Sequence, residues 1–215
     1  MKKGILFDLD GTLWDSSELV ITAWNRCIAE KTDRAERFTV RDMRGFMGKT
    51  LENIAALMFP SLPEHERLRI IEMCEDEEQA YLTEHCAPLY PHEKEVIGRL
   101  AEKYTLAVVS NSQDGYVQIY LEQCGFGELF SDMECAGRTG KDKDENIRLV
   151  MERNNITDCI YVGDTQTDML AAEKAGVPFV HAAYGFGTPE RCAASINDLT
   201  ELIGTADRLL DKGAE

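Results

Sequence analysis

Acidic side chains follow two short apolar runs of the chain, and their spacing suits phosphoryl transfer. Asp8 and Asp10 come directly after the run 4–7, two positions apart, so both side chains can point the same way where a strand ends. Asp164 follows a second apolar run, 159–162. Two carboxylates at one place repel each other, and a proton or a cation must relieve that repulsion. Three oxygen donors of this kind suit Mg²⁺ with waters, and not zinc.

Polar and cationic side chains elsewhere in the sequence could supply the phosphate-binding groups that phosphoryl transfer also needs. Ser110, whose hydroxyl can hydrogen-bond a phosphoryl oxygen, and Asn111 follow the apolar run 105–109. Lys141 and Lys143 lie in a loop that opens a helix, and a lysine can neutralise a phosphoryl group as a point charge. A carboxylate nucleophile, an acid/base, a metal and a cation would together perform phosphoryl transfer.

Each of these residues alone also has an ordinary structural interpretation. An Asp-x-Asp pair is typically a turn or a cap, and Ser110 is a common type of turn residue. Asp164 and Asp168 would also serve as an N-cap region with an exposed acid, and the two lysines as surface charges. The order and spacing of the whole set favour the catalytic interpretation, because the sequence Asp-Leu-Asp-Gly-Thr at 8–12 directly follows an apolar strand candidate.

Short apolar runs alternate with longer amphipathic stretches, which is typical of βαβ units. Buried parallel strands are predicted at 4–8, 105–109, 159–162 and 178–182, and more weakly at 130–136. Between them, Asp142 and Glu145 form a capping pair that predicts the start of a helix. We therefore expect an α/β fold with a parallel sheet. Ligands of such sheets bind outside the carboxyl ends of the strands, where the polar residues lie.

One segment interrupts the alternation. Between Asp15 and about Cys86 the chain has no convincing strand, and helices are predicted after Asp15, over 39–46, over 50–58 and over about 63–83. We expect residues 15–86 to form a small all-α cap domain over an α/β core made of residues 1–14 and 87–215. The acidic run 75–78 within the last of these helices is interpreted as a solvated helix face.

Composition and charge exclude several classes of protein. The 215 residues are 44% hydrophobic and 29% charged, as in globular proteins of one or two domains, and no stretch approaches 18 consecutive apolar residues. The net charge of −16 repels nucleic acid and anionic membranes, so neither is an expected partner. Seven cysteines without a CxxC pair favour reduced thiols and a cytoplasmic location. The sequence does not predict the oligomeric state.

The motifs resemble those of the haloacid dehalogenase superfamily of phosphotransferases over nearly all of the chain. The matching segments are Phe7 to Thr12, Val108 to Asn111, the Lys141 region, and Val162 to Asp168. The helical insertion resembles the four-helix cap of the phosphoglycolate phosphatase and β-phosphoglucomutase branch, and Tyr184 to Glu190 is more similar to the phosphatases. The resemblance implies a Rossmann-like core and a Mg²⁺-dependent phosphatase that acts on a small phosphorylated metabolite.

The resemblance also implies roles for the acidic residues. Asp8 would be the nucleophile that forms an aspartyl-phosphate, and Asp10 would act as general acid and then as general base. Mg²⁺ would be held by the Asp8 carboxylate, the Asp10 main-chain carbonyl and Asp164. Asp168 would orient that loop without binding the metal.

Ser110, Asn111 and one lysine would hold the phosphoryl oxygens. In this branch the third motif often reads Lys-Pro-x-Pro, whereas this chain has Lys141-Asp-Lys143-Asp-Glu145 and no proline. Aligning the helix starts favours Lys141, and a slip of two residues would select Lys143. Both lysines remain candidates for the lysine of this motif, and Lys141 is preferred.

The cap is expected to set substrate specificity. Lys49, in a loop between cap helices, is either a contact to a carboxylate or second phosphate of the leaving group, or a solvent-exposed lysine. A phosphonatase that uses a cap lysine, or a β-phosphoglucomutase-like phosphotransferase, is an alternative activity. A phospho-ligand-binding signalling domain is a non-enzymatic alternative, disfavoured because its phosphoacceptor would follow a later strand.

Overall fold

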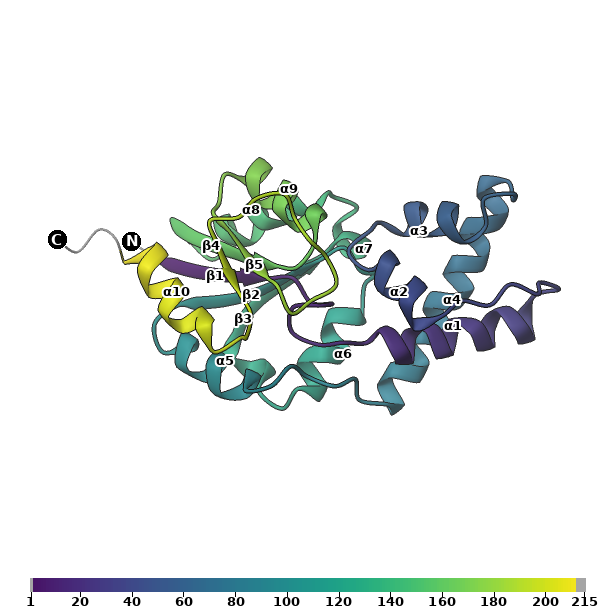
Figure 1. The fold of residues 1–215 in the computed structure, drawn as a ribbon, viewed down its shortest axis with the longest axis horizontal. Helices are drawn as coiled ribbons and strands as arrows, with labels where there is room; N and C mark the ends of the chain where they lie inside the picture. The colour runs from purple at the N-terminus through teal and green to yellow at the C-terminus, as the bar shows by residue number, and fades with distance from the viewer. Residues whose placement is uncertain (1, 212–215) are drawn as a thin grey trace.

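The computed structural model describes residues 2–211, and its core is a parallel six-stranded sheet with helices on both faces (Figure 1). The strands are β1 (Lys3–Phe7), β2 (Thr105–Ser110), β3 (Phe130–Cys135), β4 (Asp158–Gly163), β5 (Phe179–Ala182) and β6 (Ala194–Ile196). Their order is β3-β2-β1-β4-β5-β6, and every neighbouring pair is parallel. The predicted α/β, Rossmann-like three-layer fold is confirmed.

The strand order reverses beside β1. Phe7, the last residue of β1, pairs with Val108 of β2 on one side and with Val162 of β4 on the other. The later strands therefore lie on both sides of β1, and the carboxyl ends of β1, β2 and β4 meet at one edge of the sheet. Open α/β sheets bind their ligands at this kind of switch point.

Alternating side chains of the strands fill two separate apolar layers. Ile5 and Phe7 point to one face of the sheet, and Leu6 points to the other, where it packs in a cluster with Ile147. The helices of that second face are α8 (Lys143–Arg153) and α9 (Gln166–Ala175). The remaining core helices are α5 (Glu93–Ala101), α6 (Tyr116–Gln123), α10 (Glu201–Leu210) and the short α7 (Ala136–Thr139), with a 3-10 turn η1 at Gly127–Leu129.

Four helices between β1 and α5 form a separate group at one end of the sheet (Figure 1). They are α1 (Ser17–Lys31), α2 (Val40–Phe46), α3 (Leu51–Met58) and α4 (Glu64–Glu84), and they begin and end close to the predicted positions. We call them the cap helices. A reciprocal capping box between Thr39 and Asp42 starts α2, and the buried stripe of α1 includes Trp24 and Cys27.

The chain leaves the core and returns to it through two segments that lie side by side. Trp14 forms an antiparallel bridge with Leu89, and the Asp15 amide donates to the Pro88 carbonyl at 3.0 Å. The Tyr90 amide donates in turn to the Leu13 carbonyl at 3.3 Å. We call these two segments, 13–15 and 88–90, the cap junction, because they connect the cap helices to the sheet.

The interpretation of the acidic run 75–78 as a solvated helix face is wrong for one of its members. Asp76 is exposed, but only 4% of Glu78 is accessible to solvent. Glu78 stands four residues after Cys74 and seven after Ile71, which are both buried, so the three side chains share the inward stripe of α4. The helical period therefore carries one acid of the run into the interior.

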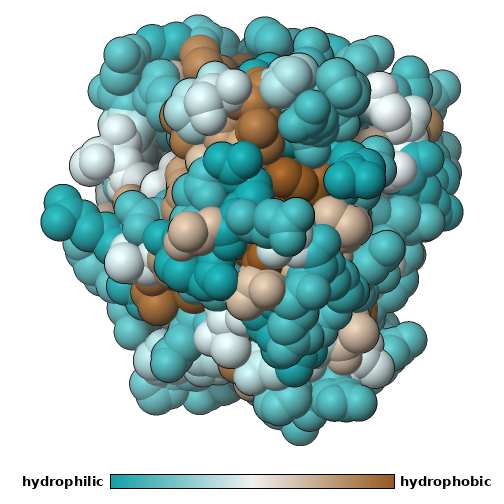
Figure 2. Space-filling view, turned by 90° about the vertical axis from the view of Figure 1, so that its right-hand side faces the viewer, coloured by the Kyte–Doolittle hydropathy of each residue, from teal (hydrophilic) through white to brown (hydrophobic). Residues whose placement is uncertain are grey.

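The outward surface of the cap end is mostly polar. Figure 2 looks onto this end of the molecule and shows a largely hydrophilic surface with smaller apolar areas between the polar side chains. Within residues 2–211, no helix is both long enough and apolar enough to cross a membrane.

Candidate active site

A tight turn after β1 places the first two acids at the sheet edge. The Leu13 amide donates to the Leu9 carbonyl at 2.8 Å, which closes the turn directly after Asp8. Gly11 sits within it at φ +79°, and a Cβ there would lie 2.3 Å from an oxygen of Asp164. Glycine therefore serves twice, since it adopts the left-handed conformation and lets the loops after β1 and β4 touch.

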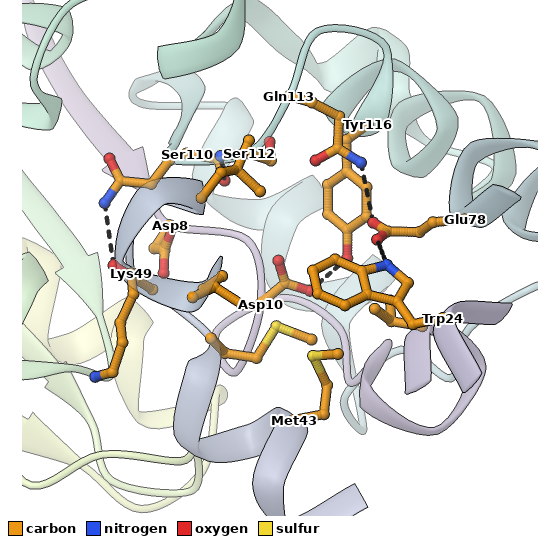
Figure 3. A pocket seen from close by; sticks show the side chains of 16 residues that line it. Asp8, Asp10, Trp24, Met43, Lys49, Glu78, Ser110, Ser112, Gln113 and Tyr116 are labelled. Atoms are coloured by element: carbon orange, nitrogen blue, oxygen red, sulfur yellow. Dashed lines mark hydrogen bonds between the residues drawn. The ribbon is translucent and has the colours of Figure 1, made fainter. Parts of the chain in front are cut away.

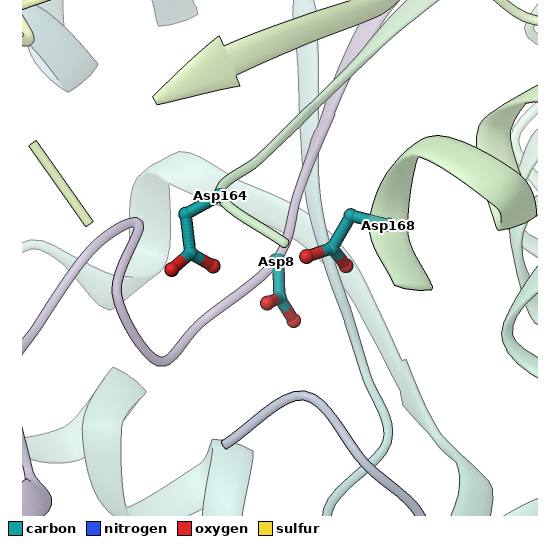
Figure 4. Close-up of side chains that lie close together, drawn as sticks. All are labelled: Asp8, Asp164 and Asp168. Atoms are coloured by element: carbon teal, nitrogen blue, oxygen red, sulfur yellow. The ribbon is translucent and has the colours of Figure 1, made fainter. Parts of the chain in front are cut away.

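Three aspartates converge at this edge (Figure 4). Asp8, Asp164 and Asp168 are each at most 2% exposed, and one carboxylate oxygen of each lies within 4.8 Å of the others. The Nζ of Lys143 lies 2.8 Å from an oxygen of Asp8 and 2.7 Å from one of Asp168. One buried cation thus faces three buried carboxylates.

The lysine at the cluster is Lys143, and not Lys141, which the sequence analysis preferred. The side chain of Lys141 is 47% exposed and lies 3.7 Å from Glu145. The reason is the reciprocal capping box between Asp142 and Glu145, which makes Lys143 the first residue of α8 and leaves Lys141 outside the helix. The same capping pair is visible in the sequence and could have selected Lys143.

The site carries more negative charge than its residues neutralise. Burial, with added repulsion from Asp168, raises the pKa of Asp8 to about 7 and that of Asp164 to about 8. One oxygen of Asp164 accepts a hydrogen bond from the Phe186 amide at 2.6 Å, but the other, also buried, has no partner within residues 2–211. A buried carboxylate oxygen without a donor is costly, and a hard divalent cation would satisfy it. The donor set therefore fits Mg²⁺.

Asp168 supports the cluster and is already fully engaged. One of its oxygens accepts from Lys143, and the other accepts from the Thr165 amide at 3.0 Å in the capping box that starts α9. These contacts connect Asp168 to the loop after β4, and its role in orienting that loop stays a prediction. Asp8 and Asp164 are left as the side chains that could bind the cation.

Asp10 is held by three donors on one oxygen. Its Oδ1 accepts from Trp14 Nε1 at 2.9 Å, from Ser16 Oγ at 2.6 Å and from the Tyr116 hydroxyl at 2.8 Å. Burial nevertheless raises the pKa of Asp10 above its usual value. The sequence analysis missed these three supporting residues. Trp14 and Ser16 follow Asp10 closely enough to have been suspected, whereas nothing local connects it with Tyr116.

A cavity of about 50 Å³ is lined both by residues of the cap helices and by Asp8 and Asp10 (Figure 3). Ser110 and Asn111 line it from the core, and the Asn111 amide donates to the Gly48 carbonyl of the cap at 3.0 Å. Lys49 also lines it, but its ammonium points away from Trp24 and Glu78 (Figure 3). The other lining residues are Asp8, Asp10, Val20, Trp24, Met43, Met47, Gly48, Leu51, Ile54, Glu78, Ser112, Gln113 and Tyr116.

Comparison with known proteins places this geometry in a family. Residues 5–182 match the model of the haloacid dehalogenase-like hydrolases. The phosphoglycolate phosphatase of Vibrio vulnificus strain CMCP6 is 31% identical over 91% of this chain and 90% of its own length. The phosphoglycolate phosphatase of Escherichia coli O157:H7 is 28% identical over 94% of this chain and 92% of its own length.

Solved structures show the same fold. A predicted phosphoglycolate phosphatase from Haemophilus somnus 129PT superposes with a TM-score of 0.83 at 23% identity, over 95% of this chain and 97% of that one. A predicted phosphatase from Clostridium acetobutylicum gives a TM-score of 0.83 at 24% identity, over 97% of this chain and all of that one. The protein belongs to the haloacid dehalogenase-like hydrolase family and is an enzyme of its phosphatase type.

Proposed function

We propose that the protein is a Mg²⁺-dependent phosphomonoesterase that hydrolyses a small phosphorylated metabolite through an aspartyl-phosphate on Asp8. The observation that carries the proposal is the buried cluster of Asp8, Asp164 and Lys143, in which one oxygen of Asp164 lacks a partner within residues 2–211. The names of the relatives support an ester of the size of phosphoglycolate. We further propose residues 15–86 as a cap domain and residues 1–14 and 87–215 as the catalytic core.

The first half of the reaction transfers the phosphoryl group to the enzyme. A carboxylate oxygen of Asp8 attacks phosphorus, and the bond from phosphorus to the leaving-group oxygen breaks. Asp10 donates its proton to that oxygen, and its raised pKa favours the protonated form that this step needs. The three donors on Oδ1 hold the carboxyl so that Oδ2 is available for the transfer.

The second half releases phosphate. Asp10, now ionised, removes a proton from a water molecule that attacks the same phosphorus. The bond from phosphorus to Asp8 breaks, which returns the free carboxylate and yields inorganic phosphate. Lys143 and the Ser110 hydroxyl would hold the phosphoryl oxygens in both halves. Asp8, Asp164 and the Asp10 main-chain carbonyl would hold Mg²⁺, which supplies positive charge against the carboxylates and the phosphoryl group.

Activity is expected to require Mg²⁺. Turnover of p-nitrophenyl phosphate should vanish in excess EDTA and return when Mg²⁺ is added, because Lys143 alone does not balance the buried carboxylates. Mg²⁺ should also raise the melting temperature in a concentration-dependent way, since a ligand that binds only the folded state stabilises it. Calcium should inhibit, because its looser and higher coordination disturbs in-line geometry. Full activity in excess EDTA would overturn the metal assignment.

Lys49→Ala is expected to change which ester is preferred. The core residues contact the phosphoryl group that all substrates share, whereas a cap side chain can reach only the leaving group. The relative kcat/KM values of different esters should therefore shift more than the value for p-nitrophenyl phosphate. An equal loss with every ester would assign Lys49 to cap closure or folding, and an unchanged profile would make it an ordinary surface lysine.

The direction of the Lys49 side chain bears on the phosphonatase alternative. That reaction needs a cap lysine amine at the substrate, whereas the ammonium of Lys49 points away from the part of the cavity lined by Trp24 and Glu78 (Figure 3). This direction gives no support to Lys49 as the amine of a phosphonatase.

A further inference from the structure

Glu78 brings a carboxyl group from the cap into the cavity that holds the candidate catalytic aspartates. It comes from α4, is 4% exposed, and lines the same cavity as Asp8 and Asp10. In Figure 3, Asp10 lies between Asp8 and Glu78. A group bound with its phosphate at Asp8 and its leaving-group oxygen at Asp10 would thus direct the rest of the leaving group toward Glu78.

The partners of Glu78 are neutral hydrogen-bond donors. Trp24 Nε1 donates to one carboxyl oxygen, and Gln113 Nε2 donates to the other at 3.0 Å. Burial, opposed by these two bonds and assisted by the negative charge of Asp10, raises the pKa of Glu78 to about 8. Each carboxyl oxygen can accept more than one hydrogen bond, so the group can still engage a ligand.

The remaining wall of this part of the cavity offers no charge that would suit an anion. Apart from its acids and Lys49, the cavity is lined by apolar and neutral side chains, among them Val20, Met43 and Ile54. Lys49 is the only cationic side chain among the described residues that line the cavity, and its ammonium points away from Glu78. A carboxylate here would lose its water shell with no cation facing it, which is unfavourable.

The cavity of about 50 Å³ is small and partly open, so a leaving group of a few atoms can lie beside Glu78. A short leaving group that ends in a hydroxyl or an ammonium would fit and would donate to the carboxyl of Glu78. The charge-assisted form of such a bond is among the stronger hydrogen bonds in proteins.

We propose that Glu78 is a specificity-determining residue, which selects small phosphate esters whose leaving group ends in a hydrogen-bond donor over those that end in a carboxylate. The proposal rests on the proposed phosphatase function and names its substrate class. It differs from a role for Lys49 in binding a carboxylate, because the two residues favour leaving groups of opposite charge.

A series of two-carbon esters tests the proposal directly. With Mg²⁺ present, kcat/KM is measured for 2-hydroxyethyl phosphate, 2-aminoethyl phosphate, ethyl phosphate and phosphoglycolate, which differ only at the end of the leaving group. We expect kcat/KM for the hydroxyl or the ammonium ester to exceed that for phosphoglycolate at least tenfold. The value for ethyl phosphate should lie between that of the better donor ester and that of phosphoglycolate. A preference for the ammonium ester would show that Glu78 binds as a carboxylate, and a preference for the hydroxyl ester would show that it binds as a neutral acid.

Glu78→Gln is compared with Glu77→Gln, which removes one charge from the same helix where it pairs with Arg26 and Lys31 and does not line the cavity. Glu78→Gln should reduce the preference for the donor ester over phosphoglycolate at least tenfold, while Glu77→Gln keeps it. A wild-type preference for phosphoglycolate overturns the proposal, above all if Lys49→Ala abolishes that preference. The proposal is also overturned if folded Glu78→Gln has the same ratio of kcat/KM for the donor ester over phosphoglycolate as the wild type. If Glu78→Gln does not fold, the wild-type ranking decides. Failure of the proposed function itself would show differently, as no turnover of any ester or of p-nitrophenyl phosphate.

Discussion

Asp8→Asn is expected to lower phosphatase turnover at least about 100-fold while the protein stays folded. The amide keeps the shape of the side chain but cannot act as the attacking carboxylate. The fold should tolerate the change, because Asp8 is one of several buried acids at the site and Lys143 keeps its contact with Asp168 at 2.7 Å. Removing one of the repelling carboxylates should leave the melting temperature equal or higher, as is common when a strained catalytic group is neutralised.

The measurement combines steady-state turnover of p-nitrophenyl phosphate with thermal unfolding. Asp33→Asn, a change of the same type at an exposed position of the cap, serves as the matched control and should behave like the wild type. Mass spectrometry of the wild-type protein stopped during turnover should locate the phosphoryl group on Asp8. Residual turnover above about 1%, without deamidation of the new asparagine, would move the nucleophile to another residue.

Lys143→Ala and Lys141→Ala are expected to differ sharply. Lys143 is buried between Asp8 and Asp168, so its removal takes away the cation that faces the phosphoryl group and leaves two buried acids unpaired. Turnover should fall by orders of magnitude, and the free energy of unfolding should fall by about 3–5 kcal/mol, as for other broken buried ion pairs. Lys141 lies at the surface, and its loss should change stability by no more than about 0.5 kcal/mol and leave the rate near normal.

Both variants should be characterised by denaturant unfolding and by kcat and KM. Lys143→Met retains much of the volume of the side chain and so separates the loss of charge from the loss of packing. If Lys143→Met is folded and turns over substrate at the wild-type rate, or if Lys141→Ala is the more damaging of the two changes, the phosphoryl-binding cation comes from another residue.

Local patterns were sufficient for most of the fold. The predicted strands correspond to β1 to β5, and the cap helices begin and end near the predicted residues, because apolar runs and capping pairs act over a few positions. β6 was missed because it has three residues and only one of them, Ile196, is buried. α10 was missed as well, since β6, the strand directly before it, was not predicted and so no further βα unit was indicated.

The site was predictable as a set of acids but not as a network. Asp8, Asp10 and Asp164 are recognisable because they follow apolar strands, and the sheet brings those strand ends together. The contact between Asp10 and Tyr116 joins residues 106 positions apart, and only the packing of α6 against the core creates it. The burial of Glu78 likewise depends on which stripe of α4 faces inward, whereas the sequence shows four adjacent acids.

The strand order also has a consequence for how the chain folds. Gly4 pairs with Thr105 and with Cys159, so β1 has no sheet neighbour until nearly half of the 215 residues have followed it. Contacts of such long sequence separation require the closure of large loops, and proteins rich in them fold slowly. The cap helices, whose contacts are local by comparison, can form while β1 is still unpaired. Asp8 and Asp164 follow β1 and β4, so the repelling charges of the candidate site come together only when these two distant strands have paired.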